Sequence, residues 1–282
     1  MPTILTVSSW VARGHVGNSA TTFPLMRRGL DVVALPTVIL AHHPGHKRDV
    51  ARAETPDLLA MGQDILGSPA PHPVDGVLVG YVAVPPQAMA ITGLIAEARA
   101  YREGIPMLLD PVSGDGGKLY VDKLIVDEIR ANLLPMADVV TPNVTELAAL
   151  AAPRRIRRAP KLTEDEIVAM ARSLGVPTVI VTSAPASAKD RIANIVITDE
   201  LAVRVETPRL EVHVQGTGDL LAGLILGEIV SGSDIVPAVA TASAIVHDLL
   251  AVTAKAGSDE LALVAGQKAI AEPKGVAEVS ML

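Results

Sequence analysis

Residues 214–223 constrain the architecture most strongly, and their sequence is Val214-Gln215-Gly216-Thr217-Gly218-Asp219-Leu220-Leu221-Ala222-Gly223. Two glycines precede an apolar run, so backbone N–H groups converge where a helix begins, and the helix N-terminus adds partial positive charge. Gly216, Thr217 and Gly218 are therefore predicted to hold a phosphate-like anion. Asp219 follows in the first turn, where its carboxylate can accept a proton from a hydroxyl that attacks a phosphoryl group. The alternative interpretation is that Asp219 only complements the helix dipole, since an acidic residue in the first turn of a helix does so.

Strands and helices alternate on the N-terminal side of this segment. Apolar runs predict buried strands at residues 3–7, 31–35, 74–79, 106–109, 138–140 and 178–181. Helices are predicted at 18–29, which ends at Gly29, at 87–102, and after Asn143 and Thr163, each followed by Glu in capping-box spacing. Residues 191–206 predict a strand pair around a turn at Asp199-Glu200, and the chain after Gly218 is mostly helical to about Ile270. The order predicts an α/β fold, with a mostly parallel central sheet and helices on both faces, in a single domain spanning residues 1–282.

Composition argues against several functional classes. The 282 residues include 24 Lys and Arg against 31 Asp and Glu, and a formal net charge of −7 does not favour a nucleic-acid binder. There is no cysteine, so disulfides, zinc-thiolate sites and thiol nucleophiles are excluded. We find no signal peptide and no uninterrupted run of about 18 apolar residues, so we expect a cytoplasmic protein that does not span a membrane.

Polar groups follow two of the predicted strands, at the edge of the sheet where ligands bind in parallel α/β folds. The first group is Asp110-Pro111-Val112-Ser113-Gly114-Asp115-Gly116-Gly117-Lys118-Leu119-Tyr120. Asp110 and Asp115 can hold Mg²⁺ through water, although an ordinary glycine-rich turn has a similar composition. The second group is Thr141-Pro142-Asn143-Val144-Thr145-Glu146, in which Glu146 either caps a helix or orders water around a metal. The Gly-x-x-x-x-Gly-Lys-Ser/Thr pattern of a P-loop is absent.

The N-terminal region supplies Ser8-Ser9-Trp10 and Gly14-His15-Val16-Gly17-Asn18-Ser19-Ala20. No Gly-x-Gly-x-x-Gly follows the first strand, which argues against a nicotinamide oxidoreductase. His15 is interpreted as a packed, hydrogen-bonded histidine. The basic segment at residues 153–158 is interpreted as a solvated surface turn.

Together these motifs resemble the ribokinase-like superfamily and, within it, the pyridoxal kinases of vitamin B6 salvage, over nearly the whole chain. The resemblance rests on residues 14–20, Asp110-Pro111-Val112 with Gly114-Asp115 and Leu119-Tyr120-Val121, Thr141-Pro142-Asn143 with Glu146, Gly216-Thr217-Gly218-Asp219, and Glu260-Leu261 with Gln267. It implies ATP, Mg²⁺, often a monovalent cation such as K⁺, and a homodimer. The γ-phosphate of ATP would pass to the 5′-hydroxymethyl group of pyridoxal, pyridoxine or pyridoxamine.

The same resemblance implies a role for each site residue. Asp219 would be the catalytic base, with Gly216, Thr217 and Gly218 as the anion hole. The metal and the phosphates would be served by Asp110, Asp115, Thr141 and Glu146, with Asp110, Asp115 and Glu146 holding the metal. Thr182 and Ser183 would lie near the nucleotide, and Leu210, Glu211 and Val212 would border its adenine or ribose. The vitamin would be bound by Ser9, Trp10, His43, Tyr81, Tyr120 and Asp219.

The aromatic residues give independent support for a heterocyclic substrate. Of five aromatic residues, Trp10, Tyr81 and Tyr120 are predicted in loops at this site. Offset or edge contacts with an aromatic ring contribute about 0.5–1.5 kcal/mol per pair beyond area burial. Chance placement of core aromatics would give the same pattern.

The chain departs from the family's pattern at three places. Pro44-Gly45 stands where relatives carry substrate-contacting residues, Trp10 replaces a smaller or different polar residue, and Ser183-Ala184-Pro185-Ala186 lacks a lysine found in some relatives. A lid at residues 41–48 or 114–119 is expected to exclude water. Two alternatives stay open: a kinase for hydroxymethylpyrimidine, and a non-catalytic vitamin-binding protein on the same scaffold.

Overall fold

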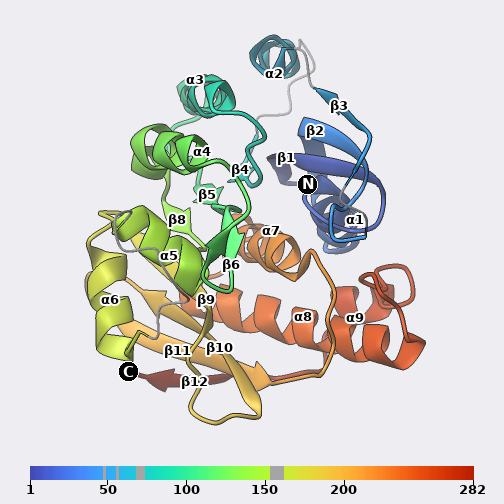
Figure 1. Cartoon of the computed structure of the whole chain (residues 1–282), viewed down its shortest axis with the longest axis vertical. Coiled ribbons are helices and arrows are strands. Elements are labelled where there is room, and N and C mark those ends of the chain that lie inside the picture. The colour runs from blue at the N-terminus through green and yellow to red at the C-terminus, as the bar shows by residue number, and fades with distance from the viewer. Residues whose placement is uncertain (47–48, 55–56, 68–73, 153–161) are drawn as a thin grey trace.

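The computed structural model describes residues 1–46, 49–54, 57–67, 74–152 and 162–282. Within these ranges one ten-stranded sheet has the order β12-β11-β10-β9-β8-β5-β4-β1-β2-β3, and a separate hairpin pairs β6 with β7 (Figure 1). The strands are β1 Thr3–Arg13, β2 Asp31–His42, β3 Arg52–Glu54, β4 Gly76–Val79, β5 Met107–Leu109, β6 Gly114–Asp115, β7 Lys118–Leu119, β8 Val139–Val140, β9 Thr178–Ala184, β10 Arg191–Ile197, β11 Ala202–Pro208 and β12 Glu278–Met281.

The helices are α1 Asn18–Arg27, α2 Leu58–Leu66, α3 Pro86–Tyr101, α4 Lys123–Glu128, α5 Val144–Ala151, α6 Glu164–Arg172, α7 Thr217–Val230, α8 Ile235–Ala256 and α9 Gln267–Ala271. A π-helical turn at Ile129–Leu133 and a 3₁₀ turn at Leu134–Met136 continue α4. The six central strands, from β9 to β2, pair in parallel, while β10, β11, β12 and β3 pair antiparallel at the two ends of the sheet. The predicted mostly parallel sheet is confirmed, and the carboxyl ends of its central strands share one edge.

Alternating side chains along each central strand build two cores, one on each face of the sheet. In β5, Leu109 packs on the face covered by α2 to α6, and Leu108 packs on the face covered by α1, α7, α8 and α9. In β9, Val181 packs on the same face as Leu109, and Ile180 packs on the same face as Leu108. Strands buried on both faces are near-continuous apolar runs, and for that reason the sequence revealed them.

Local signals for helix ends are confirmed where the sequence was most explicit. Asn143 with Glu146 and Thr163 with Glu166 both form complete capping boxes, in which each side chain accepts the backbone N–H of the other residue. Helix α1 ends at Arg27, and Gly29 follows with a φ of 83°, a left-handed conformation that suits glycine. The turn at Asp199-Glu200 joins β10 to β11 as predicted.

One expectation about the first strand is wrong. Trp10 lies inside β1 and not in a loop, because β1 continues to pair with β2 as far as Arg13 opposite His42. Pairing of this length is a tertiary effect that overrides the local polar sequence. Tyr81 and Tyr120 do lie outside regular elements, after β4 and β7. The basic segment 153–158 lies outside the described residues.

Helix α8 is, by length and composition alone, apolar enough to cross a membrane, with a mean hydropathy of 1.8. It packs against α7, α9, β10 and β11, and it supplies Val239, Ile245 and Leu249 to one core. A core helix of this kind meets the same criterion.

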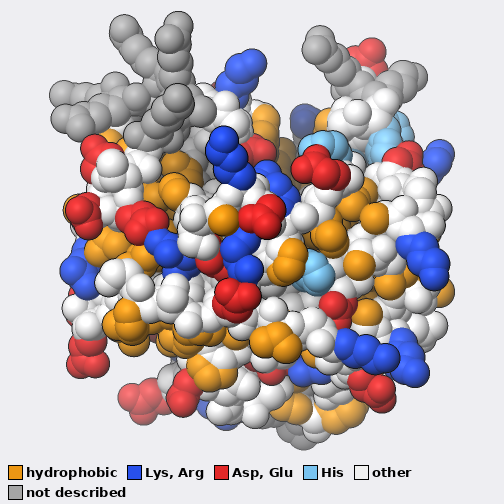
Figure 2. Space-filling model, turned by 90° about the horizontal axis from the view of Figure 1, so that it is seen from below, with side chains coloured by type: hydrophobic (Ala, Val, Ile, Leu, Met, Phe, Trp, Pro, Cys, Tyr) orange, Lys and Arg blue, Asp and Glu red, His pale blue; other side chains and the backbone are white. Residues whose placement is uncertain are grey.

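On the face shown in Figure 2, acidic and basic side chains are interspersed and are not gathered by sign.

Candidate active site

Helix α7 begins at the Gly-Thr-Gly-Asp segment, with Gly216 as its N-cap residue and Asp219 in the first turn. Gly216 has a φ of 84°, and a Cβ atom there would overlap the backbone carbonyl oxygen of His15. Only glycine fits this position, because it combines left-handed backbone with close approach of a second chain segment. The helix start predicted from the sequence is therefore also the point where the 14–17 loop meets α7.

The carboxylate of Asp219 is held by that same loop. The backbone N–H of Gly17 hydrogen-bonds to Asp219, as does the residue's own backbone N–H. Burial raises the pKa of Asp219 from its ordinary value of 3.8 to about 6, while these hydrogen bonds favour the ionised form. A carboxylate with this pKa is ionised at neutral pH and still basic enough to accept a proton from a bound hydroxyl.

Contacts across the 14–17 loop bring Ser9 and Tyr81 to the same region as Asp219. A Cβ atom at Gly17 would meet the backbone carbonyl and the hydroxyl of Ser9, so Ser9 packs directly on the residue that bonds Asp219. The backbone N–H of Tyr81 donates to the hydroxyl of Ser8, at 3.0 Å. Ser9 is buried, and burial raises the pKa of Tyr81. Ser8 and Ser9 inside β1, and the backbone of Tyr81 after β4, therefore lie beside the loop that bonds Asp219.

A second group of carboxylates lies at the ends of β5 and β8. Asp110 is 7% exposed and accepts a hydrogen bond from the Thr141 hydroxyl at 3.1 Å. Burial, followed by the negative charges of Glu146 and Asp219, raises the pKa of Asp110 well above its ordinary value. Asp110 is therefore close enough to Glu146 and Asp219 to be repelled by their charges, and a bound cation would favour its ionisation.

Glu146 connects the start of α5 to the glycine-rich segment after β5. Its Oε1 accepts the N–H groups of Ser113 and Gly114, at 2.9 and 3.4 Å, and its Oε2 accepts the N–H of Asn143 at 3.0 Å. The residue is 4% exposed, and burial raises its pKa to about 7 even though these three donors favour the charged form. Asn143 Nδ2 donates to the Gly114 carbonyl at 2.8 Å and reinforces the connection. The capping role of Glu146 is confirmed, and the same carboxylate also holds the segment after β5.

Replacing Glu146 by Gln is expected to change the pH dependence of stability. The folded pKa of about 7 exceeds the ordinary value of 4.5, so the wild-type carboxyl contributes its full stability below about pH 4.5 and loses it as pH rises through 7. The difference in free energy of unfolding between Glu146→Gln and the wild type should therefore shift in favour of the variant as the pH rises from 5 to 8. One pKa unit corresponds to about 1.4 kcal/mol, so the gain has an upper limit of about 3 kcal/mol.

Urea unfolding of metal-free protein at several pH values measures this difference. Glu166→Gln is the matched control, because Glu166 has the same capping-box role in α6 but is exposed. Its difference from the wild type should not vary with pH over this range. A constant difference for Glu146→Gln as well would contradict the raised pKa of Glu146.

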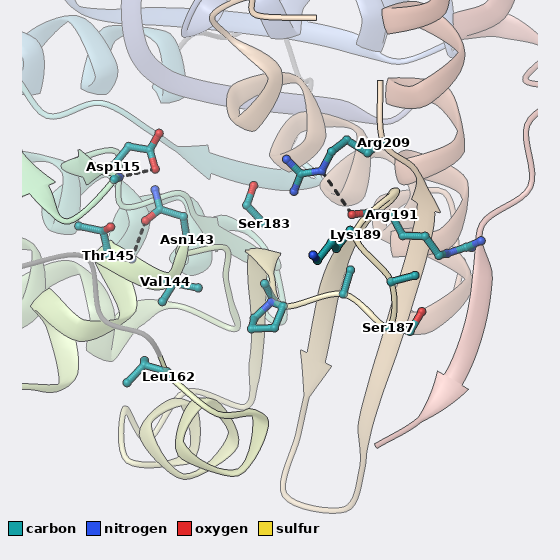
Figure 3. Close-up of a pocket in the computed structure, with 15 residues that line it drawn as sticks. Asp115, Asn143, Val144, Thr145, Leu162, Ser183, Ser187, Lys189, Arg191 and Arg209 are labelled. Atoms are coloured by element: carbon teal, nitrogen blue, oxygen red, sulfur yellow. Dashed lines mark hydrogen bonds between the residues drawn. The ribbon is translucent and has the colours of Figure 1, made fainter. Parts of the chain in front are cut away.

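A cavity of about 750 Å³ opens beside this cluster. Figure 3 shows Asp115, Asn143 and Thr145 on one side of it, Lys189 and Arg209 on the other, and Ser183 between them. Ser183 has a φ of 50°, unusual for a residue with a side chain. Lys189 has no hydrogen-bond or ion-pair partner within the described ranges. A free cation beside polar groups suits an anionic ligand.

Sequence reasoning missed the cationic wall of this cavity, which consists of Lys189, Arg191 and Arg209. No lysine stands at residues 183–186, but Lys189 follows three residues further along the chain. Of the residues expected at the nucleotide, Asp115 and Ser183 line the cavity. Thr182, Leu210, Glu211 and Val212 are not among its lining residues. Thr182 is adjacent, and its N–H donates to the Pro142 carbonyl at 2.9 Å.

The remaining residues expected to bind the substrate lie around the carboxylates or at the end of β2. Tyr120 is 59% exposed as a whole residue. The pKa of its hydroxyl is raised by local burial and by the negative charges of Glu146, Asp110 and Asp219. His43 follows β2 and accepts the N–H of Gly45 at 3.0 Å. No three His, Asp or Glu side chains form a ready metal-ligand set in the described part of the chain. Asp110, Asp115 and Glu146 therefore do not form a preassembled cage.

The gathering of carboxylates at the strand ends, against the glycine-rich start of α7, is the arrangement of a small-molecule kinase with a ribokinase-like fold, and the chain is a protein of this class. The family model described as phosphomethylpyrimidine kinase matches residues 76–263. Pyridoxal kinases of Rubrobacter xylanophilus and Leifsonia xyli are 35% and 33% identical, with 96% of this chain covered in both cases and 94% and 96% of the relatives. The chain therefore belongs to the phosphomethylpyrimidine kinase family and, within it, to the pyridoxal kinases.

Solved structures agree with this assignment. The pyridoxal kinase of Leishmania donovani in complex with ADP and pyridoxamine is 26% identical, and the match covers 100% of both chains with a TM-score of 0.87. The same kinase in complex with ADP and pyridoxine covers 99% of both chains with a TM-score of 0.86.

Proposed function

We propose that this chain transfers the γ-phosphate of ATP to the 5′-hydroxymethyl group of pyridoxal, with pyridoxine and pyridoxamine as further acceptors, in vitamin B6 salvage. One observation supports the proposal most directly. Asp219 stands at an anion-binding helix N-terminus and shares the 14–17 loop with Ser9, so a hydroxyl bound beside Ser9 lies within reach of a carboxylate. The names and ligands of the relatives support the same substrate.

The reaction requires alignment and charge stabilisation more than covalent chemistry. Asp219 accepts the proton of the attacking hydroxyl. The N–H groups at Gly216, Thr217 and Gly218, with the positive end of α7, stabilise the negative charge that develops on the transferred phosphoryl group. Residues 41–46 and 114–119 exclude water from the reacting groups, because an open site would hydrolyse ATP.

The nucleotide occupies the cavity between the β6–β7 hairpin and the β9–β10 connection. Ser183 and Thr182 lie near its phosphates or ribose, and Lys189 offers a free positive charge to the phosphates. Leu210, Glu211 and Val212 border the adenine or ribose from the connection between β11 and α7. Thr141 serves the phosphates together with Asp110.

Mg²⁺ fits the oxygen-rich cluster at the ends of β5 and β8. Buried carboxylates with raised pKa values lack a counter-charge, and Mg²⁺ prefers a few carboxylates with water and phosphate oxygens to a complete protein cage. Asp110 and Glu146 would hold it through water, with Asp115 at the rim of the cavity. When bound, the ion supplies positive charge to the phosphates.

The vitamin lies against Ser9, Tyr81 and Tyr120, with Trp10 and His43 completing its surroundings. Ser9 hydrogen-bonds the pyridine ring. Edge or offset contact with the tyrosine rings favours an aromatic heterocycle.

An ATP-consumption assay on pyridoxal, pyridoxine, pyridoxamine and hydroxymethylpyrimidine tests the proposal, with Mg²⁺ present and with K⁺ or Na⁺ as the monovalent cation. Turnover should be largest with a B6 vitamer. The description of the matching family model favours one alternative, a hydroxymethylpyrimidine kinase, which would show the reverse preference. Binding of a vitamer without any ATP turnover would indicate a non-catalytic vitamin-binding protein.

We also propose an oligomeric state and a location for the protein. Residues 1–282 act as one kinase domain that forms a homodimer in the cytoplasm and binds neither nucleic acid nor membrane. Light scattering and sedimentation of the purified protein measure the oligomeric state.

A further inference from the structure

The 14–17 loop is held between the catalytic helix and a segment near the C-terminal end of α8. On one side, the His15 carbonyl packs on Gly216, and the Gly17 N–H donates to Asp219. On the other side, the loop faces residues 258–263, which connect α8 to α9. The position of the Asp219 carboxylate therefore depends on what fixes this loop from outside.

Glu260 holds the 14–17 loop directly. The His15 backbone N–H donates to Glu260 Oε2 at 3.1 Å, and a Cβ atom at Gly14 would overlap the Glu260 carboxylate. The ring of His15 lies against the backbone of Leu261, and burial lowers the pKa of His15, which favours the neutral ring. Glu260 is itself anchored, because its N–H donates to the Ser258 hydroxyl at 3.1 Å and its carbonyl accepts from that hydroxyl at 2.7 Å.

The second carboxylate oxygen of Glu260 bonds a different segment. Its Oε1 contacts His46 Nε2 at 2.5 Å, and the Glu260 side chain is only 17% exposed. His46 belongs to residues 43–46, which follow β2 and include His43 of the proposed vitamin site. The two oxygens of one carboxylate thus join two segments that lie about thirty residues apart in the sequence.

We propose that Glu260 is a positioning residue that couples residues 43–46, at the vitamin side of the site, to the loop that orients Asp219. This inference rests on the proposed function. The arm to His15 sets the Gly17 N–H and so acts on kcat, while the arm to His46 sets residues 43–46 and so acts on the KM for the vitamin. None of these contacts involves a residue that lines the nucleotide cavity, so the KM for ATP should not change.

Kinetics of three variants separate the two arms. Glu260→Ala removes both, and we expect kcat to fall and the KM for pyridoxal to rise, each by about 10- to 100-fold, as for displaced catalytic groups in general. His46→Asn removes one arm and should raise only the KM for pyridoxal. Asp259→Ala is the control, because Asp259 is the exposed neighbour of Glu260 and should behave as the wild type.

Amide hydrogen exchange gives a readout that does not depend on activity. Peptides covering residues 14–17 and 43–46 should both exchange faster in Glu260→Ala, and only the second should do so in His46→Asn. Unchanged exchange at residues 14–17 in Glu260→Ala, or equal effects of both variants on both segments, would overturn the proposal. If the wild-type protein phosphorylates no vitamer, the proposed function is refuted. The exchange measurement does not depend on activity, so it would still test the coupling by Glu260.

Discussion

Replacing Asp219 by Asn is expected to lower kcat with pyridoxal by at least about two orders of magnitude, while ATP still binds. General base catalysis contributes roughly 10²- to 10⁴-fold, and Asn keeps the shape of the side chain without its basicity. The loss should appear in kcat and not in the KM for ATP, because Asp219 does not line the cavity proposed for the nucleotide. Coupled kinase assays measure the rates, and calorimetry measures ATP affinity.

The pH–rate profile sharpens this test. Burial raises the pKa of Asp219 to about 6, so wild-type activity should fall below pH 6 as the base becomes protonated. The residual activity of Asp219→Asn should lack that acid limb. Asp234→Asn is a suitable control, since Asp234 precedes α8 as its N-cap residue and makes no side-chain cap bond. Near-normal turnover in Asp219→Asn would mean that Asp219 only complements the helix dipole.

Replacing Gly216 by Ala is expected to have the second largest effect. The new Cβ atom would overlap the His15 carbonyl, and the left-handed conformation costs about 1–2 kcal/mol for a residue with a side chain. Relief of the overlap requires the 14–17 loop to move away from α7, which displaces the N–H that bonds Asp219. We expect a free energy of unfolding lower by about 2–4 kcal/mol and a kcat reduced by more than tenfold.

Gly232→Ala isolates the conformational part of that effect. Gly232 follows α7 with a φ of 97°, and no atom lies within 4 Å of a Cβ atom placed there. This control should lose stability by about 1–2 kcal/mol, measured by denaturant unfolding, and should keep its kcat. Equal losses of stability and unchanged turnover in both variants would show that contact between the 14–17 loop and α7 is unimportant.

The features predicted correctly are those encoded locally. The capping boxes at Asn143 and Thr163 each require only residues three positions apart, and the start of α7 follows from two glycines before an apolar run. The central strands are buried on both faces and appear as short apolar runs. A parallel sheet then brings their carboxyl ends together, which explains why polar residues chosen from separate parts of the sequence lie in one region.

The features that were missed depend on distant partners. Glu260 and His15 are 245 positions apart, and nothing local to either residue indicates their hydrogen bond. Strand β12 is short and exposed, and only pairing with β11 makes it a strand. Lys189 has an ordinary sequence context, and its importance comes from the cavity that it faces.

The position of Trp10 has a practical consequence for spectroscopy. It is the protein's one tryptophan, and it lies in β1 next to Ser9, with Ile39 of β2 as its pairing partner. Indole emission from the intact enzyme therefore originates from a single known location. Titrations followed by intrinsic fluorescence report on that neighbourhood alone, so occupancy can be observed without attaching a dye.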